Sequence, residues 1–411
     1  MQLLTQTRAR YQIWRQWPND HRQLGVAPPL VVSRPPRRSH RPAPRTQFLS
    51  PRASATVPFT LENGLVLRHF TLDELNFLYR EVYQERVYLR HGVTIRPGDT
   101  VVDVGANTGL FTLLAAEEAG PGGRVVALEP LQRTFQLLVS NVESHAEWCA
   151  AGGRQVASPV LLNCGAGAPA PGQESATFVT YSDSASGWST MYPHDGEVAA
   201  NMQRYILHMM MEEEEEEGHT PQSPPPSPPP RGGEGQGDAG RGAVEAAAST
   251  GGDWQRQQQQ QQPGAGVPEP ALARLARALW WRAPPLRPLL RAAGSLYVRF
   301  VMLGGQRRWS CRLVPLSRLI REQRLQRIDL LKVDVERAEL DVLYGISSDD
   351  WQLIRQVVME VHDLDGRLDV VRALLESAGF TDVVLEQEPG LAGGTLHMLY
   401  AVRRDAPAAA G

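Results

Sequence analysis

The sequence predicts an α/β fold built on a mostly parallel sheet, with helices on both faces and a closing antiparallel strand pair. Two observations predict it. Short apolar segments that suit buried strands alternate with longer segments in which apolar residues repeat at helical spacing. The last two apolar segments follow each other with no helical segment between them, which suits an antiparallel pair. With 42% apolar and 21% charged residues, the 411-residue chain has a globular composition.

The first half of the sheet comes from the region before residue 170. A helix that ends at Gly120 follows the first strand. A helix over 131–144 follows the second strand and is opened by Pro130, whose missing N–H costs little at a helix start. We expect the three strands of this half over 99–104, 124–129 and 160–165.

The second half begins near residue 328 and repeats the same alternation. Two strands are each followed by a helix, and the second of these helices ends at Gly379. Strands that alternate with helices imply a parallel sheet covered on both faces, an arrangement of the Rossmann-like kind. We expect strands over 328–335 and 356–362, helices over 338–346 and 366–380, and a closing pair over 382–388 and 396–404.

Two segments of biased composition divide the chain. Residues 1–57 hold ten arginines against one acidic residue, and resemble an organelle transit peptide or a solvated basic arm. Residues 211–270 include runs of Glu, Pro, Gly and Gln that cannot bury enough apolar surface to offset the entropy of ordering. We therefore expect a disordered leader, a disordered insertion and a tail at 404–411. The flanks 58–210 and 271–403 then form one domain. The expected location of the protein is an organelle (chloroplast or mitochondrion) or the cytoplasm.

Cysteine usage and hydropathy limit the function classes. Cys149, Cys164 and Cys311 are too few and too scattered for a disulfide framework or a zinc site, which favours a reducing compartment and burial as small apolar side chains. No apolar run approaches the roughly 18 residues needed to span a bilayer, so we expect no transmembrane segment. The sequence shows no tandem repeats or base-stacking motifs, which argues against a nucleic-acid partner.

The segment VVDVGANTG joins the first strand to the first helix. Gly105, Asn107 and Gly109 form a G-x-N-x-G turn, in which backbone N–H groups and a helix N-terminus approach a ligand closely. The G-x-G-x-x-G pattern of dinucleotide-binding folds is absent there. Glu129 ends the next strand, where its carboxylate can accept hydrogen bonds from both ribose hydroxyls, and Asp103 suits a cationic ligand. Together these residues favour S-adenosylmethionine over NAD, with a plain strand–helix joint as the alternative.

A basic segment follows the insertion. Residues 271–321 contain eleven arginines and no acidic residue, and Leu272, Leu275 and Leu279 fall on one face of an expected helix. This pattern suits an anionic acceptor, a phosphate-bearing carrier or weak peripheral contact with an anionic membrane, and equally a cap helix with a solvated basic face. Residues 184–192 (SASGWSTMY) are expected at the mouth of the site.

Several of these segments together resemble the FkbM-type S-adenosylmethionine-dependent methyltransferases, most closely the subgroup found as domains in polyketide and peptide synthetases. The resemblance covers about 57–210 and 285–403 and rests on VVDVGANTGLFTLL, ALEP, IDLLKVDVERAELDVLYGI and VVMEVHDLDGRL. It implies a Rossmann-like S-adenosylmethionine-dependent methyltransferase fold, with S-adenosylmethionine as cofactor. It also implies methyl transfer to an oxygen of a small or carrier-bound molecule.

The resemblance assigns residues as well. Its first cofactor motif matches Asp103, Gly105, Asn107 and Gly109, and its ribose-binding acid matches Glu129. A lysine–aspartate–glutamate motif matches Lys332, Asp334, Glu336 and Glu339. Many members have glycine after the first glutamate of that motif, whereas this chain has Arg337, as the synthetase subgroup has a basic residue there.

Three residues are candidates for catalysis: Asp334, Glu336 and His362. Asp334 and His362 close two parallel strands, at the sheet edge where ligands bind in open α/β folds. An alcohol acceptor benefits from a base, and the ordinary pKa of histidine lies near neutrality. Two alternatives stay open: His362 is a structural hydrogen-bonding residue, or the three side chains hold a divalent ion. The interpretation we favour needs no metal.

The sequence thus favours an S-adenosylmethionine-dependent O-methyltransferase with a small-molecule or carrier-bound acceptor. A catalytically inactive nucleoside-binding module and an NAD-dependent oxidoreductase are the alternatives. The acidic residues at the expected site count against the first, and the missing third glycine counts against the second.

Overall fold

The computed structural model describes most of the chain outside its two biased segments. Val57 begins the first strand and Met211 ends the helix before the insertion. Val57 is thus the described residue of the predicted leader, and Met211 that of the predicted insertion. The rest of both segments and the predicted tail lie outside the described residues. The described residues are 57–61, 63–170, 172–211, 271–387 and 391–403.

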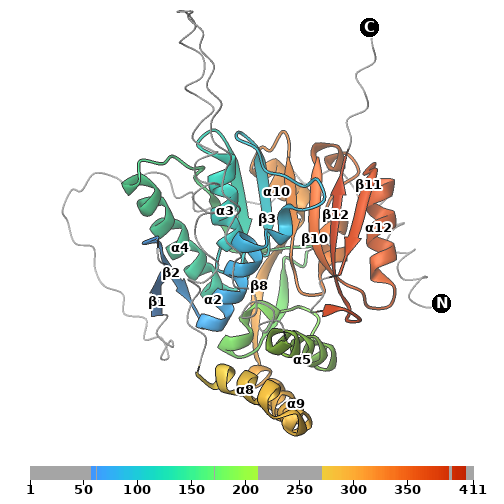
Figure 1. Cartoon of the computed structure of the whole chain (residues 1–411). Helices are drawn as coiled ribbons and strands as arrows, with labels where there is room; N and C mark the ends of the chain where they lie inside the picture. Colours follow the sequence, from blue (N-terminus) through green and yellow to red (C-terminus); the bar gives the residue numbers. More distant parts are fainter. Residues whose placement is uncertain (1–56, 62, 171, 212–270, 388–390, 404–411) are drawn as a thin grey trace, which may run out of the picture.

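A seven-stranded sheet forms the centre of the molecule (Figure 1). The sheet ends with β12 (Leu396–Val402), which pairs antiparallel with its inner neighbour and with the edge strand β11 (Asp382–Glu386). The predicted α/β class, with a mostly parallel sheet and a closing antiparallel pair, is confirmed. The remaining strands run parallel, in the order β5 (Val160–Leu162), β4 (Arg124–Leu128), β3 (Thr100–Val104), β9 (Leu330–Val333) and β10 (Gln356–His362).

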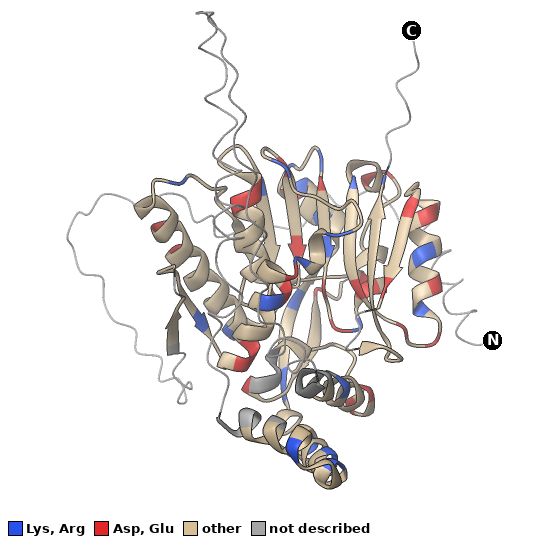
Figure 2. Ribbon diagram, viewed as in Figure 1, with Lys and Arg blue, Asp and Glu red and all other residues tan. Residues whose placement is uncertain are grey.

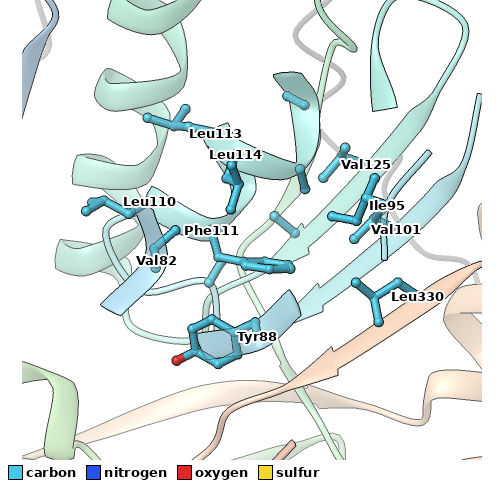
Figure 3. Close-up of a cluster of buried hydrophobic side chains, with 14 of the residues drawn as sticks. Val82, Tyr88, Ile95, Val101, Leu110, Phe111, Leu113, Leu114, Val125 and Leu330 are labelled. Carbon is cyan, nitrogen blue, oxygen red and sulfur yellow. The ribbon is translucent and has the colours of Figure 1, made fainter. Parts of the chain in front are cut away.

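Helices cover both faces of this sheet. Neighbouring strand residues alternate between two apolar clusters, since successive side chains point to opposite faces: Val101 packs in one cluster and Val102 in the other. Figure 3 shows the first cluster, where Phe111 lies beside Val101, Leu330 and Tyr88. That face carries α2 (Leu72–Tyr79), α3 (Leu110–Ala119) and α4 (Gln132–Ala151); the other carries α10 (Leu316–Glu322), α11 (Glu339–Tyr344) and α12 (Arg367–Ser377).

Among the predicted boundaries that differ from the structure, two bear on the fold. Helix α4 begins after Pro130 and Leu131 and extends to Ala151, because the buried face continues beyond residue 144 through His145 and Cys149. Strand β5 ends at Leu162, and the chain then leaves the main sheet. The three cysteines are buried and free, and burial raises the pKa of each thiol to about 11.

A second sheet of three strands, which the sequence analysis did not anticipate, crosses the gap left by the insertion. Strand β8 (Arg307–Val314) pairs antiparallel with β7 (Ser175–Thr180) and parallel with β6 (Gly165–Ala166). Both partners precede the insertion, so the two flanks of the chain share one sheet. A separate hairpin joins β1 (Val57–Thr60) and β2 (Val66–His69).

Three further helices lie together at one end of the molecule, near the bottom of Figure 1: α5 (Asp195–Met211), α8 (Ala271–Arg282) and α9 (Arg287–Tyr297). The expected helix is thus present as α8, and blue basic residues are visible at this end of the molecule in Figure 2. Apolar side chains are also exposed here, including Leu289 at 67% and Phe300 at 72%. None of the described helices is both long and apolar enough to cross a membrane.

Candidate active site

The carboxyl ends of β3, β4 and β9 meet at one edge of the main sheet. The turn after β3 passes so close to β9 that a Cβ on Gly105 would lie 1.8 Å from the carbonyl oxygen of Asp334. Gly105 has φ +80° and Asn107 has φ +49°, a left-handed conformation that glycine and asparagine tolerate best. The glycine is therefore required here because two backbones touch.

A cavity lies at this edge, and its opening together with the adjoining solvent takes up about 700 Å³. The ends of three neighbouring strands, β4, β3 and β9, border it. Part of the segment predicted at the mouth, Gly187 with Ser189 to Met191, lines the same cavity. Its lining also includes Gly105, Asn107, Glu129, Asp334 and Glu336.

Glu129 lies in this lining with a buried carboxylate. Its Oε1 accepts the N–H of Leu131 at 2.8 Å, and its Oε2 accepts the N–H of Asn107 at 3.2 Å. Burial raises the pKa of Glu129 to about 8, and the two backbone donors oppose that rise only in part. Each oxygen keeps a second lone pair, so the carboxylate can still accept hydrogen bonds from a diol.

Asp103 and Gly109, both predicted to bind the cofactor, lie behind the cavity and not in its lining. The Asp103 carboxylate is fully buried; Thr112 Oγ1 donates to it at 2.6 Å, and Lys332 Nζ lies 3.2 Å away. Gly109 is the N-cap of α3, where an added Cβ would lie 2.5 Å from Leu138 of α4. These two residues shape the turn without lining the cavity.

Lys332 joins the two halves of the site. This buried ammonium lies 3.2 Å from Asp103 and 3.1 Å from Asp334, and donates to the carbonyl of Gly105 at 3.0 Å. Burial alone would lower the pKa of Lys332, but the two carboxylates raise it above its ordinary value. The hydroxyl of Tyr88 reaches Asp334 Oδ2 at 2.9 Å. Asp334 is thus held in place at the cavity wall.

His362 lies behind Glu336, fully buried and outside the cavity lining. Its Nδ1 is 2.7 Å from Glu339 Oε1, and its Nε2 is 3.0 Å from Glu336 Oε2. Burial by itself would lower the pKa of His362, but Glu336 and Glu339 raise it well above its ordinary value. The structure therefore brings Glu336 and His362 together, and only Glu336 reaches the cavity.

Sequence reasoning missed Glu360, which joins this group. It precedes His362 by two residues on β10, so the two side chains point to the same face of the sheet. Burial, Asp334 and Glu336 raise the pKa of Glu360 well above its ordinary value. The signal was available in the sequence, because Glu-x-His at a strand end places both groups together.

Arg337 points away from the cavity, although its sequence position suggested charge beside the site. Its φ of +63° lies in the left-handed region that favours glycine. The guanidinium is buried, and Nε donates to Glu197 of α5 at 2.7 Å. The residue thus fixes α5 to the loop that carries Glu336.

The sequence of this chain is similar to the sequences of known proteins. The profile of the methyltransferase FkbM domain matches residues 311–381. The "31-O-demethyl-FK506 methyltransferase FkbM" of Streptomyces tacrolimicus is 32% identical over 343 residues, which cover 84% of this chain and 95% of that protein. The chain belongs to the FkbM methyltransferase family. It is a methyltransferase, and S-adenosylmethionine is its methyl donor.

Other proteins share parts of this similarity. The "AMB antimetabolite synthetase AmbE" of Pseudomonas aeruginosa is 29% identical over 349 residues, which cover 84% of this chain and 12% of the synthetase. Among solved structures, Aeropyrum pernix fibrillarin with natively bound S-adenosyl-L-methionine is 10% identical, with a TM-score of 0.31 over 86% of this chain and 85% of that one. Membership of the FkbM family decides against the NAD-dependent oxidoreductase.

The cavity of this FkbM-family chain fits S-adenosylmethionine. The Asn107 Oδ1 atom is buried and accepts no hydrogen bond from any described residue, so it is available to an amino or ammonium donor. The carboxylate of Glu129 has lone pairs left that suit the hydroxyls of a ribose. When bound, S-adenosylmethionine supplies an electrophilic methyl group. Which of these residues contact it remains a prediction.

Proposed function

We propose that the protein methylates a hydroxyl oxygen of a small or carrier-bound metabolite. The name of the S. tacrolimicus relative refers to an O-methyl position of its own substrate, and AmbE is a synthetase. The first name supports oxygen as the acceptor atom.

The observation that carries the proposal is the placement of two further carboxylates in the lining of the same cavity as Glu129. Asp334 and Glu336 line the wall at the end of β9. Lys332 and Tyr88 hold Asp334, which leaves its second oxygen to accept a hydrogen bond from an acceptor hydroxyl. A carboxylate in that position orients the hydroxyl and polarises its O–H bond.

His362 has a different role in this proposal from the direct base that the sequence suggested. Glu339 and Glu336 lie against both of its ring nitrogens, and the cavity lies beyond Glu336. We assign it a positioning role: it holds Glu336 toward the acceptor. Asp334 and Glu336 remain the candidate catalytic residues.

We also propose that 58–210 and 271–403 work as one domain. Two contacts join the flanks across the insertion. Strand β7 pairs with β8, and Glu197 forms a buried ion pair with Arg337. The exposed Arg282, Arg291 and Arg299 near α9 suit an acceptor that carries phosphate.

The test is a transfer assay with methyl-labelled S-adenosylmethionine and paired acceptors that differ only in hydroxyl or amine, each free and linked to phosphopantetheine. Labelled ether from the hydroxyl acceptors supports the proposal. Asp334→Asn should lower kcat at least about 100-fold, the typical contribution of acid–base catalysis, in a variant whose thermal melt shows that it is folded. Label on the amine alone, or full turnover by the variant, would contradict it.

A further inference from the structure

A cluster of potential metal ligands lies directly behind the cavity wall. One ligand atom from each of Glu336, Glu360 and His362 lies within 4.8 Å of the others. The sequence had suggested Asp334 as the third ligand, but Asp334 is already paired with Lys332 and Tyr88. Glu360 takes that place.

Two atoms of this cluster have no hydrogen-bond partner among the described residues. They are Glu336 Oε2 and His362 Nε2, both buried; the histidine side chain is 0% exposed and the glutamate 10%. The two atoms form an ion pair at 3.0 Å but lie outside hydrogen-bond geometry. Buried polar atoms without partners are rare, because each one costs free energy.

The separation of these atoms suits two ligands of one ion. Metal–ligand bonds of about 2.1 Å at right angles place the two ligand atoms about 3.0 Å apart. The observed Nε2–Oε2 distance is 3.0 Å. A cation that replaces the proton on Nε2 would be bound by both atoms at once.

Glu339 prepares His362 for this role. Its Oε1 lies 2.7 Å from Nδ1 of His362, and its Oε2 accepts Arg367 at 2.6 Å. A carboxylate that binds one ring nitrogen orients the imidazole and directs the lone pair of the other nitrogen toward a metal, as is usual for metal-bound histidines. Here that other nitrogen is the unpartnered Nε2.

We propose that Glu336, Glu360 and His362 bind a divalent transition-metal ion of the Mn²⁺ or Zn²⁺ class. Two carboxylates and one imidazole suit such ions better than Mg²⁺ or Ca²⁺, which prefer oxygen ligands alone. Glu339 is a positioning residue in this site.

The site borders the acceptor side of the cavity, because Glu336 also lines the cavity. An ion there can bind the acceptor hydroxyl and lower its pKa; the proton leaves to water and the electron pair stays on oxygen. This consequence rests on the proposed function, whereas ion binding does not.

The test is Mn²⁺ titration of the full chain after treatment with a chelator, with no S-adenosylmethionine or acceptor present. Electron paramagnetic resonance reports free Mn²⁺, and pulsed measurements report nitrogen coupling from an imidazole ligand. We expect one site with nitrogen coupling. Glu339→Gln should weaken the Kd by about 10–100-fold and Glu360→Gln by about tenfold or more. Glu376→Gln, on the surface of α12, is the matched control and should bind as the wild type does.

No stoichiometric binding by the wild type, binding without nitrogen coupling, or wild-type affinity in folded Glu360→Gln would each overturn the inference. Because ion binding is read without turnover, its failure is separate from failure of the proposed function. A chelated enzyme that still methylates hydroxyls at full rate would remove the ion's role in the reaction.

Discussion

Glu129→Gln is the sharpest test of how the cavity holds its cofactor. The substitution keeps the shape of the side chain and removes its charge. In the structure each carboxylate oxygen already accepts one backbone N–H, from Leu131 at 2.8 Å and from Asn107 at 3.2 Å. The glutamine amide has one oxygen, so one of the two N–H groups loses its acceptor.

The expected losses of affinity and stability follow from the number of hydrogen bonds removed. Glu129 is 5% exposed, so solvent screens its interactions little. The variant loses one charge-assisted hydrogen bond to the ribose diol, which is worth about 1.5–3 kcal/mol. That loss corresponds to a Kd for S-adenosylmethionine weaker by about 10–150-fold. The orphaned N–H should also lower the free energy of unfolding by about 1–3 kcal/mol.

The pH dependence gives a second signature of the same residue. The pKa of Glu129 is about 8 in the free protein, whereas a diol prefers the ionised carboxylate. Binding should therefore tighten with rising pH by about tenfold per unit below pH 8 and level off above it. 5′-Methylthioadenosine is the appropriate probe, because it has the ribose but no amino group that titrates in this range. The variant should show a flat profile.

Isothermal titration calorimetry measures both effects, with Glu322→Gln, a surface residue of α10, as the control. A thermal melt must show that the Glu129→Gln protein is folded. Unchanged affinity in that folded variant, or the same pH profile with and without the carboxylate, would refute the ribose assignment.

Three further substitutions test the scaffold. Gly105→Ala should abolish cofactor binding, because its methyl would overlap the carbonyl of Asp334, whereas Gly122→Ala, whose added methyl has nothing within 4 Å, should bind normally in the same calorimetric assay. Lys332→Met should lower the free energy of unfolding by about 3–5 kcal/mol in urea, since it leaves two carboxylates without their buried cation; a loss below 1 kcal/mol would count against the network. Arg337→Gly should cost a net amount of about 2–4 kcal/mol, because relief of the positive φ offsets only part of the lost buried ion pair; a more stable variant would show that strain dominates.

Much of the fold could be predicted from periodicity. The parallel strands of the main sheet are short and apolar, and helical spacing separates them, so the α/β class and the closing pair were accessible. The second sheet was not. Strand β8 has the sequence RRWSCRLV, with exposed arginines. Its partners β6 and β7 precede the insertion, so no local sequence pattern predicts their pairing.

The site divides in a similar way. Glu129, Asn107, Asp334 and Glu336 follow strand ends, and a sequence can place residues at strand ends. It cannot distinguish a residue in the cavity wall from one behind it. His362 also ends a strand, yet it is enclosed by two carboxylates and does not reach the cavity.

By itself the sequence determined the order of strands and helices, the glycine turn and the acids at the strand ends, because these depend on neighbours within a few residues. Only the tertiary structure decided which side chains meet. The pairing of Lys332 with Asp103, of Arg337 with Glu197, and of Glu360 with His362 and Glu336 depends on how separate strands and helices pack. Burial then sets the charge state of these groups, since removal of water strengthens every interaction among them.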